Sequence, residues 1–466
     1  MKDAIAARRA EYEAKRDRLV GEFEAIRRAG SPVRLAKQTS NLFRIRPRAR
    51  GPALDVRDLN GVIAVDPVGN RAEVEGMATY ESVVDATLPH GRMPAVVPQL
   101  KTITVGGAVT GGGIESSSFR YGFVHESIAA LEVLTGAGEI LYCTPDNANS
   151  ELFYGFANSY GTLGYALRLW IHLIPVKPYV HMVHRHTTDP QRYFSELEAL
   201  CLAERKRGDG VAFVDGTVFA SDALYRTEGS FVDAAPGTSN YRFMQVYYRS
   251  ISRRTEDFLT IRDYLWRWDA DWFWCSRAFG AEFPPLRFVA GLCGLLRSTT
   301  YWKLRDWNER HGILRRVGMM RNVEWVIQDV EVPVARAAGF LEFLLHEIGI
   351  RPIWICPVMA PGSQAVFPLY RTDSNSLYIN FGFWGGVRSR RESGYFNRRV
   401  EEEVVACGGK KSLYSDAYFP PETFWEQYDQ NAYTRLKRVY DPDGVFPDLY
   451  QKCVGDMNHE REERSR

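Results

Sequence analysis

Cysteine is scarce in this sequence and follows no regular spacing. The 466 residues contain seven cysteines, at positions 143, 201, 275, 293, 356, 407 and 453, and no CxxC pair. Zinc ribbons need such pairs, and small disulfide-bonded domains need an even set of closely spaced cysteines. The sequence therefore argues against both, and we expect a protein that folds in a reducing cytoplasm.

Long apolar runs are also missing. The longest, around residues 288–296, is far shorter than the ~20 apolar residues that a helix needs to cross a bilayer. Residues 1–30 are charged throughout and lack the apolar core of a secretory signal. We therefore expect a cytoplasmic protein that contacts a membrane only peripherally.

An excess of charge of one sign is absent as well. Lys and Arg total 59 against 57 for Asp and Glu, a net charge of +2, which argues against a dedicated nucleic-acid-binding protein. Lysine itself is rare, with 11 copies beside 48 arginines, and this ratio indicates a GC-rich, bacterial coding sequence. The composition, 45% hydrophobic and 25% charged, is that of an ordinary folded chain, and its length predicts more than one domain.

Short strands and turns dominate the first part of the chain after an N-terminal helix, which is predicted over residues 3–29. Because strands and short helices do not alternate as regular βαβ units, the fold class is α+β. The predicted strands are two hairpins, 61–66 with 71–76 and 129–135 with 139–143, and a long strand at 166–175. Aromatic residues become dense after residue 178. We predict five segments: an N-terminal helix (1–30), a first domain (31–178), a second domain (179–407), a C-terminal segment (408–455) and a disordered tail (456–466).

Two glycine clusters are the most informative local feature. Residues 104–118 read TVGGAVTGGGIESSS, and residues 158–164 read NSYGTLG. Glycines let backbone N–H groups approach an anion closely, and neighbouring hydroxyls add donors, so a diphosphate is a suitable ligand. Tight packing is the alternative explanation. Ser116 stands where GxGxxG would need its last glycine, so a Rossmann site is not supported.

These clusters, together with CTP-x-N-SELF-like residues 143–153, resemble the FAD-binding domain of the vanillyl-alcohol-oxidase (PCMH-type) flavoproteins. The delta-24-sterol reductase family is the closer match, and the similarity continues in RPIWICP (351–357), LYSDAY (413–418) and FWE (424–426). The resemblance implies a PCMH-type FAD-binding domain of two α/β subdomains, made from residues 31–178 and the return of residues 408–455. It further implies an α/β substrate cap domain at residues 179–407.

The resemblance also implies which residues hold FAD. Thr104–Ser117 would wrap the pyrophosphate, and the second cluster would contact the other side of the nucleotide. Lys37, Thr39, Ser40 and Asn41 remain possible donors to phosphate or ribityl oxygens. The candidate cofactor-binding residues are Lys37, Thr39, Ser40, Asn41, Thr104, Val105, Gly106, Gly107, Thr110, Gly111, Gly112, Gly113, Ile114, Glu115, Ser116, Ser117, Gly122, His125, Gly161, Thr162 and Gly164.

One departure from the wider superfamily concerns covalent attachment. Many members carry an Arg-x-Gly-Gly-His-Ser loop whose His bonds to the flavin, whereas residues 36–43 here read AKQTSNLF. Without that His, a covalent bond at this position is impossible. We expect non-covalent FAD.

The acid or base of the reaction stays open among three candidate catalytic residues: Tyr414, Asp416 and Glu115. Tyrosine is protonated near neutral pH without any shift of its pKa, which favours Tyr414 as an acid. His125 faces the flavin or packs behind it. His181, His184 and His186 do not share one strand face, so we expect no metal site. Cys356 is expected to be a buried apolar residue.

A basic amphipathic stretch spans residues 287–321, where eight basic and two acidic residues are interleaved with Leu, Phe, Trp and Met. It suits an anionic membrane surface, and a solvated helical face is the alternative. With the family resemblance, it favours a lipid substrate collected from a bilayer.

Three functions are compatible with these features. The preferred one is FAD-dependent reduction of a lipid carbon–carbon double bond, in a methylene-branched fatty acyl chain or a sterol side chain. NADPH is the candidate electron donor and a lipid methyltransferase the candidate partner, with no nucleic acid involved. The alternatives are an oxidase or dehydrogenase of an alcohol or hydroxy acid, and a flavin-binding subunit without activity of its own.

The absence of the linking His yields a direct prediction. The purified protein should be yellow, and heat or acid denaturation should release its FAD into solution. The measurement is the flavin absorbance of the supernatant after the protein has been precipitated. Flavin that stays with the precipitated polypeptide would contradict non-covalent binding.

Overall fold

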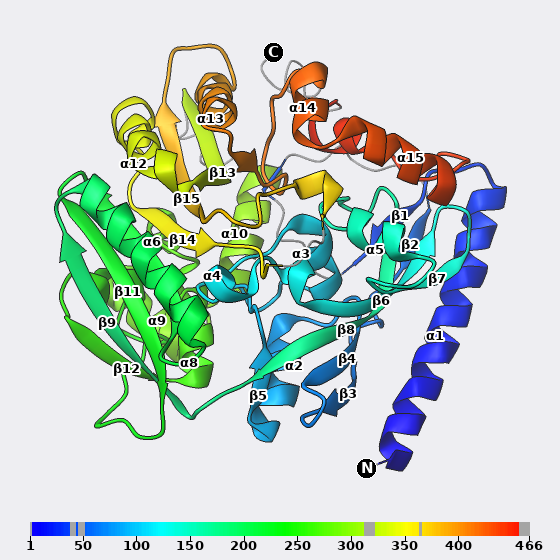
Figure 1. The fold of residues 1–466 in the computed structure, drawn as a ribbon, viewed down its shortest axis with the longest axis horizontal. Coiled ribbons are helices and arrows are strands. Elements are labelled where there is room, and N and C mark those ends of the chain that lie inside the picture. Colours follow the sequence, from blue (N-terminus) through cyan, green and yellow to red (C-terminus); the bar gives the residue numbers. More distant parts are fainter. Residues whose placement is uncertain (1, 38–42, 45–51, 312–321, 363–365, 456–466) are drawn as a thin grey trace.

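Two large antiparallel sheets form the framework of the protein, and helices pack against each of them (Figure 1). The computed structural model describes residues 2–37, 43–44, 52–311, 322–362 and 366–455. The mixture of helices and antiparallel strands confirms the α+β class. The predicted tail, residues 456–466, lies outside the described residues.

The first sheet has six strands. In spatial order they are β3 (Val62–Asp66), β4 (Arg71–Glu75), β8 (Gly164–Pro175), β6 (Ile128–Thr135) and β7 (Ile140–Cys143), with β5 (Arg92–Pro94) paired to β8. Both predicted hairpins and the long strand are thereby confirmed. The first hairpin turns where Asp66 Oδ1 accepts hydrogen bonds from the N–H groups of Val68 and Gly69, at 3.1 and 2.9 Å. The short helices α2 (Tyr80–Thr87), α3 (Val105–Gly111), α4 (Ser118–Tyr121) and α5 (Ser150–Gly155) lie between these strands in the sequence.

The N-terminal helix α1 (Lys2–Arg28) lies along the outer side of the first sheet (Figure 1). Its apolar side chains Tyr12, Leu19 and Phe23 are fully buried, so the helix packs on the body of the protein. Beneath it, Arg168 bridges Glu132 and Glu73 at 2.6 and 2.8 Å. A small parallel pair, β1 (Arg34–Ala36) and β2 (Ala53–Asp55), follows α1 in the chain.

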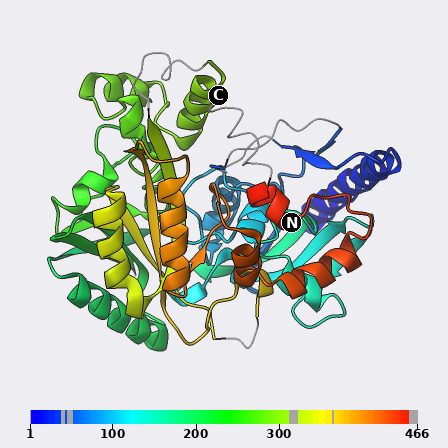
Figure 2. The same cartoon turned by 90° about the horizontal axis from the view of Figure 1, so that it is seen from above.

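The second sheet has eight strands. In the sequence, its first strand follows the last strand of the first sheet after three residues. In spatial order the strands are β12 (Glu256–Thr260), β9 (Tyr179–Thr187), β11 (Ala223–Val232), β10 (Val211–Ala220), β14 (Ile353–Val358), β15 (Tyr378–Arg388), β13 (Val323–Pro333) and β16 (Lys410–Lys411). One face is covered by helices α6 (Pro190–Arg207), α12 (Val334–Phe343) and α13 (Tyr395–Ala406), seen edge-on in Figure 2. The described residues of this part also form helices α7 (Tyr247–Ile251), α8 (Ile261–Leu265), α9 (Pro284–Leu292) and α10 (Ser298–His311).

Strand alternation decides which side chains of the second sheet leave the helix-covered face. On β13, Val326, Val330 and Val332 pack in the core under the helices. Successive strand residues point to opposite faces, so Asp329 and Glu331 point the other way, toward the first sheet. The same alternation turns Trp354 of β14 and Trp384 of β15 away from the helices.

The C-terminal segment leaves the second sheet after β16 and returns to the first. It contains helices α14 (Pro421–Gln427) and α15 (Gln430–Tyr440), and α15 lies beside α5, as Figure 1 shows. Lys437 Nζ donates to the carbonyl of Thr162 at 2.8 Å, next to the second glycine cluster. Residues distant in sequence therefore meet around the two glycine clusters.

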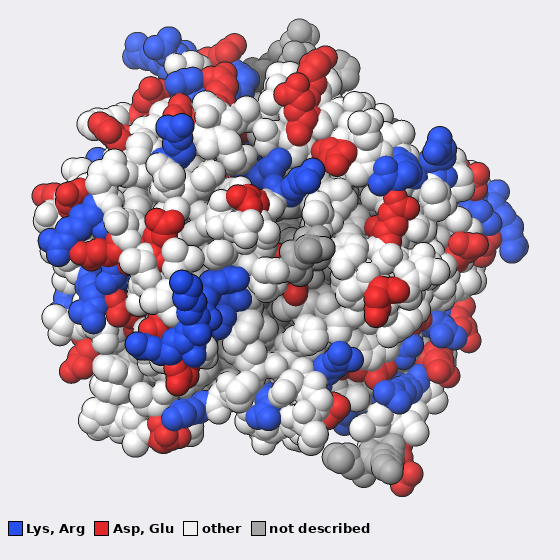
Figure 3. All heavy atoms as spheres, viewed as in Figure 1, with Lys and Arg blue, Asp and Glu red and all other residues white. Residues whose placement is uncertain are grey.

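Charge is dispersed over the surface. On the face shown in Figure 3, acidic and basic side chains are interspersed, in keeping with the net charge of +2. Within the described ranges, every helix is too short or too polar to span a bilayer.

A buried arginine joins the two sheets. Arg267 is 1% exposed, and its Nη2 lies 2.8 Å from Glu115 Oε1 and 2.7 Å from Asp215 Oδ2. Glu115 belongs to the first glycine cluster and Asp215 to β10, while the guanidinium stacks on Tyr264. A buried cation between two buried carboxylates is costly to remove, because the carboxylates would then lack a counter-charge.

This geometry predicts a large loss of stability for Arg267→Met. The substitution should lower the free energy of unfolding by about 3–5 kcal/mol, measured by urea denaturation. Arg262→Met is the matched control: Arg262 pairs with Asp85 at the surface, where such pairs contribute about 0–1 kcal/mol. Equal effects of the two substitutions would show that the buried cluster does not carry this stability.

Candidate functional site: a cofactor cleft with a tyrosine–aspartate pair

A cavity of about 910 Å³ lies where the first sheet, the second sheet and the C-terminal segment meet. Its walls include the first glycine cluster, the start of β8, the inward residues of β13–β15 and residues 444–452. Apolar and aromatic side chains make up much of its lining, with a few polar groups between them. Such a cavity suits a large, mostly apolar ligand that is oriented by a few polar contacts.

Part of the first glycine cluster is helical, which changes how it can bind an anion. Residues 105–111 form α3, and Thr104 caps its N-terminus by accepting from the N–H of Gly107 at 3.3 Å. The N–H of Gly106 donates to the carbonyl of Gly76, and that of Ala108 to the carbonyl of Thr104. These donors are thus already used. Gly112, with φ +70° and open space beside it, ends the helix and faces the cavity.

The structure brings about half of the predicted cofactor-binding residues into the cavity lining. They are Lys37, Thr104, Gly106, Gly107, Thr110, Gly111, Gly112, Gly113, Ile114, Gly161 and Gly164. Seven others lie outside the lining: Val105, Glu115, Ser116, Ser117, Gly122, His125 and Thr162. Thr39, Ser40 and Asn41 fall outside the described residues. The assignment of all of them to FAD stays a prediction.

Four cationic residues line the cavity: Arg34, Lys37, Arg44 and Lys452. Only Lys37 was predicted from the sequence, because the other three belong to no local motif. Arg44 stacks on Tyr160 at 5.0 Å, and Tyr160 OH in turn donates to the carbonyl of Gly111. Burial, together with the charges of Arg44 and Lys37, lowers the pKa of Lys452 to about 7. An anion bound here would favour its charged form.

Buried donors of this cavity fit a diphosphate. Arg44 Nε and Gln99 Nε2 are buried, and neither has a hydrogen-bond partner among the described residues. A buried donor without a partner is costly unless a ligand or water satisfies it. Both residues line the cavity beside the glycine cluster. The pyrophosphate of FAD would supply acceptors and negative charge at this place.

The same cavity also holds a tyrosine bonded to an aspartate, and the backbone of this tyrosine adjoins Arg44: the N–H of Arg44 donates to the carbonyl of Tyr414 at 3.2 Å. Tyr414 OH donates to Asp329 Oδ2 at 2.7 Å and accepts from Trp384 Nε1 at 2.9 Å. Asp329 Oδ1 also accepts from Asn380 Nδ2 at 2.7 Å. Burial raises the pKa of Asp329 to about 7, despite these hydrogen bonds and the nearby charge of Lys411. Burial and Asp329 raise the pKa of Tyr414 above its ordinary value.

A second carboxyl group lies two residues further along β13. Glu331 accepts a hydrogen bond from Tyr370, and burial and the neighbouring Asp329 raise its pKa to about 8. Asp329 and Glu331 both line the cavity. The cavity therefore contains two carboxyl groups that hold protons at or near neutral pH.

The other candidates for catalysis lie elsewhere. Glu115 is held in the buried cluster with Arg267, and Asp416 is half-buried and outside the cavity lining. His125 packs between Phe123 and Phe367, and burial lowers its pKa to about 3. Cys356 is fully buried, and burial raises the pKa of its thiol well above the ordinary value. Of the three predicted catalytic residues, only Tyr414 lines the cavity.

The histidines of β9 also have ordinary partners. His184 is buried and hydrogen-bonded to Thr227 at 2.8 Å, while His181 lies 3.0 Å from the carboxylate of Glu256 on β12. Sequence inspection had not paired His181 with a carboxylate, because the two strands are distant in the chain. The described residues contain no group of three side chains placed to hold a metal ion.

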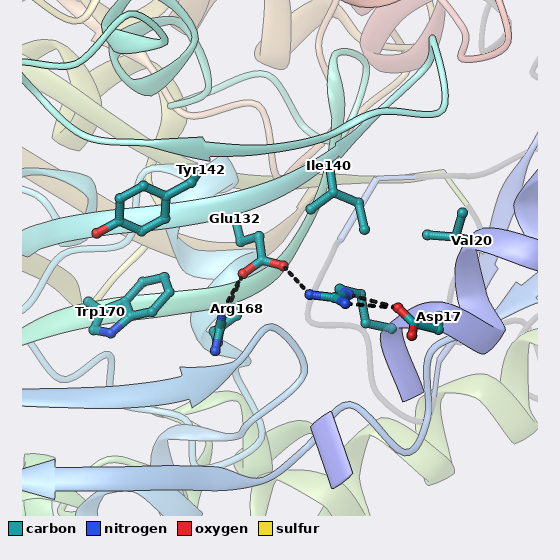
Figure 4. A pocket seen from close by; sticks show the side chains of 8 residues that line it. Asp17, Val20, Glu132, Ile140, Tyr142, Arg168 and Trp170 are labelled. Carbon is teal, nitrogen blue, oxygen red and sulfur yellow. Dashed lines mark hydrogen bonds and ion pairs between the residues drawn. The ribbon is translucent and has the colours of Figure 1, made fainter. Parts of the chain in front are cut away.

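A separate hollow of about 790 Å³ lies between α1 and the first sheet (Figure 4). Its charged side chains satisfy each other: Glu132 pairs with Arg168 at 2.6 Å and with Arg16 at 3.9 Å, and Arg16 pairs with Asp17. With its charges paired in this way, it offers a ligand little, and the cavity between the sheets remains the candidate site.

Comparisons with known proteins agree with this geometry. Residues 14–144 match the FAD binding domain family. The chain is therefore a flavoprotein with a PCMH-type FAD-binding domain, as its motifs predicted.

Similarity extends over most of the chain. It is 29% identical to Delta(24)-sterol reductase of Homo sapiens over 425 residues, which cover 86% of this chain and 78% of that protein. It is 24% identical to the Delta(24)-sterol reductase of Pisum sativum, and the alignment covers 90% of this chain and 79% of that protein. A shorter alignment of 161 residues, 31% identical, covers 34% of this chain and 29% of cytokinin dehydrogenase 10 of Oryza sativa subsp. japonica. The protein is an FAD-binding oxidoreductase related to the Delta(24)-sterol reductases.

The cationic residues of the cavity lead to a binding prediction. Arg44→Gln and Lys452→Gln should each raise the dissociation constant for FAD by about tenfold or more, because a hydrogen bond to a charged group contributes about 1.5–3 kcal/mol. Flavin fluorescence during titration of the apoprotein measures the constant. Lys101→Gln is the control, since Lys101 pairs with Glu81 away from the cavity. Unchanged FAD affinity in both variants would place the diphosphate elsewhere.

Proposed function

We propose that this protein is an FAD-dependent reductase of a carbon–carbon double bond in a lipid. The preferred substrate is a methylene-branched fatty acyl chain, reduced to its methyl-branched product, and a sterol side chain is the second choice. The observation that carries the proposal is the Tyr414–Asp329 pair, which lines the same cavity as the first glycine cluster. Similarity to the Delta(24)-sterol reductases supports the same kind of reaction.

Reduction of an alkene needs a hydride at one carbon and a proton at the other. FAD, when bound in its reduced form, supplies the hydride. The proton is the task of this chain's own residues, and Tyr414 is the group placed to give it. Apolar walls from Trp272, Phe273 and Trp354 hold the alkene and exclude water.

Asp329 controls where the proton of Tyr414 points. Trp384 Nε1 can only donate, so it occupies one acceptor position of the phenol oxygen. When Asp329 is ionised, the phenol donates to its carboxylate and turns away from the substrate. When Asp329 is protonated, its own O–H can donate to the phenol oxygen, which frees the phenol proton for the alkene. Asp329 then replaces the proton that Tyr414 has given.

The protonation states favour reduction over oxidation. An alcohol oxidase needs a base that is ionised at neutral pH, whereas burial raises the pKa of Asp329 to about 7 and that of Glu331 to about 8. Both groups thus hold protons when the enzyme works near or below neutral pH. The oxidase or dehydrogenase of an alcohol or hydroxy acid remains the alternative function.

The remaining parts of the proposal concern supply and location. Residues 31–178 with 408–455 would bind FAD, and residues 179–407 would bind the lipid. A methylene-branched chain arises when a methyl group is transferred to an unsaturated one, so a lipid methyltransferase is the proposed partner. NADPH is the proposed electron donor, and an anionic membrane surface the proposed place of work.

A reoxidation experiment tests the reaction and its acid together. Chemically reduced enzyme should be reoxidised faster by a methylene-branched acyl lipid than by air, and the rate should fall as pH rises through about 7, where Asp329 loses its proton. Burial favours the protonated form of Asp329, while the hydrogen bonds from Asn380 and Tyr414 and the charge of Lys411 favour the ionised form, so these groups together set the midpoint. The measurement is stopped-flow flavin absorbance.

Two variants locate the acid. Tyr414→Phe should slow reoxidation by about a hundredfold or more, since a positioned acid contributes about 10²–10⁴ in rate, while FAD stays bound. Asp329→Asn should remove the fall above neutral pH. Rapid flavin reduction by simple alcohols, with peroxide formed, would instead support the oxidase.

A further inference from the structure

Apolar side chains exposed to solvent are concentrated in one short part of the chain. Of the fifteen most exposed large apolar side chains in the described ranges, eight lie between residues 283 and 307. They are Phe283, Leu286, Phe288, Val289, Leu292, Leu295, Leu304 and Trp307. We call them the α9–α10 face. In Figure 2 the light-green helices of this region lie at one edge of the molecule, away from the sheets.

Helix α9 has the reverse of the usual orientation: its charged side chain is buried and several of its apolar side chains are exposed. A surface helix normally turns its apolar side chains inward and its charges outward. Here the one charged residue, Arg287, is 1% exposed, whereas Val289 and Leu292 are 56% and 68% exposed. Arg287 Nη1 lies 2.5 Å from Asp271 Oδ1, and its Nη2 donates to the carbonyl of Gln245 at 2.6 Å. The ion pair beneath the helix therefore anchors it with its apolar side outward.

Charge indicates which apolar medium would cover this face. Residues 283–307, which span this face, contain four basic residues and one acidic residue, Asp306. Of the basic residues, Arg287 is buried, whereas Lys303 is exposed beside Leu304 on α10. The side chain of Glu282, just before the face, is 6% exposed and paired with Arg249. An apolar surface with more basic than acidic residues matches an anionic bilayer, whose headgroups attract cations and whose acyl chains accept apolar side chains.

The α9–α10 face is also close to the cavity. On the inner side of α10, Trp302 packs against Trp272 and Phe43, with ring centroids 5.2 and 4.8 Å apart. Trp272 and Phe43 line the cavity. Helix α10 thus separates this part of the cavity wall from the exposed side chains of Leu304 and Trp307, so a lipid at this helix would have only a short distance to travel.

We propose that the α9–α10 face docks the protein on an anionic lipid bilayer by inserting apolar side chains, next to the cavity wall that Trp272 and Phe43 form. This inference rests on the proposed function for its lipid substrate. It differs from the electrostatic contact expected from the basic stretch 287–321, because Arg287 points inward. Residues 312–321 of that stretch lie outside the described residues.

Vesicle flotation tests the docking face without substrate or turnover. The FAD-loaded protein should float with vesicles of equal parts phosphatidylcholine and phosphatidylglycerol. Val289→Glu and Leu292→Glu should each weaken binding by about tenfold or more, since burying such a side chain contributes about 1.5–3 kcal/mol. The matched control is Val439→Glu on α15, because the exposed fraction of Val439, 52%, is similar to that of Val289, 56%. Bound FAD and an unchanged melting temperature verify folding in every variant.

Several outcomes would overturn the proposal. They are a parent protein that does not bind, Val289→Glu and Leu292→Glu variants that bind like the parent, and an equal loss in Val439→Glu. A concentration-dependent dimer that Val289→Glu dissociates would assign the face to a second copy of the chain. Vesicle binding without alkene reduction would reject the proposed function alone, and reduction of a detergent-dispersed alkene without vesicle binding would reject this inference alone.

Discussion

Arg267 is a guanidinium held out of solvent between the carboxylates of Glu115 and Asp215, and both parts of the site depend on this contact. Glu115 belongs to the first glycine cluster, so its pairing fixes the position of the segment that forms one wall of the cavity. Trp354 Nε1 also lies 3.5 Å from Asp215 Oδ2, which ties a tryptophan of the opposite wall to the same cluster. A buried charge cannot shift without losing its partners, so the width of the cavity is set by electrostatics as much as by packing.

The cavity combines two sets of polar groups, and each suits one half of the proposed reaction. Arg44 and Lys452 provide positive charge beside glycines, which suits a diphosphate. Asp329 and Glu331 are carboxyl groups whose raised pKa values keep protons available, and aromatic side chains share their cavity. Desolvation is the main cause of the pKa shifts in both sets, because it lowers the pKa of a buried lysine and raises that of a buried carboxyl. One low-polarity environment thus shifts the pKa values of both sets.

The α9–α10 face extends the same principle to the outside of the protein. The Arg287–Asp271 pair beneath α9 is buried like the Arg267 cluster, and burial raises the pKa of Asp271 to about 6 even beside its arginine. The buried ion pair thus holds α9 in place, while the apolar side chains of this helix are exposed at the surface. The arrangement is intelligible if the medium outside is a lipid.

Local sequence determined the hairpins, the long strand β8, the helix α1 and the glycine clusters, because turn residues and periodicity act over a few neighbouring positions. The motifs around the glycines also identified the flavoprotein class, and Tyr414, predicted as a catalytic residue, lines the cavity. Tertiary structure decided the rest. Asp329 and Tyr414 are more than eighty residues apart in the sequence, and Arg44 and Lys452 more than four hundred. No local sequence pattern predicts that such distant residues interact. In the folded protein, residues 105–111 form a helix whose N–H groups already have partners. Arg287, which the sequence suggested as a surface cation, is buried and paired with Asp271. The physical reason is that pKa values, burial and partners are properties of the packed environment, which exists only once distant segments have come together.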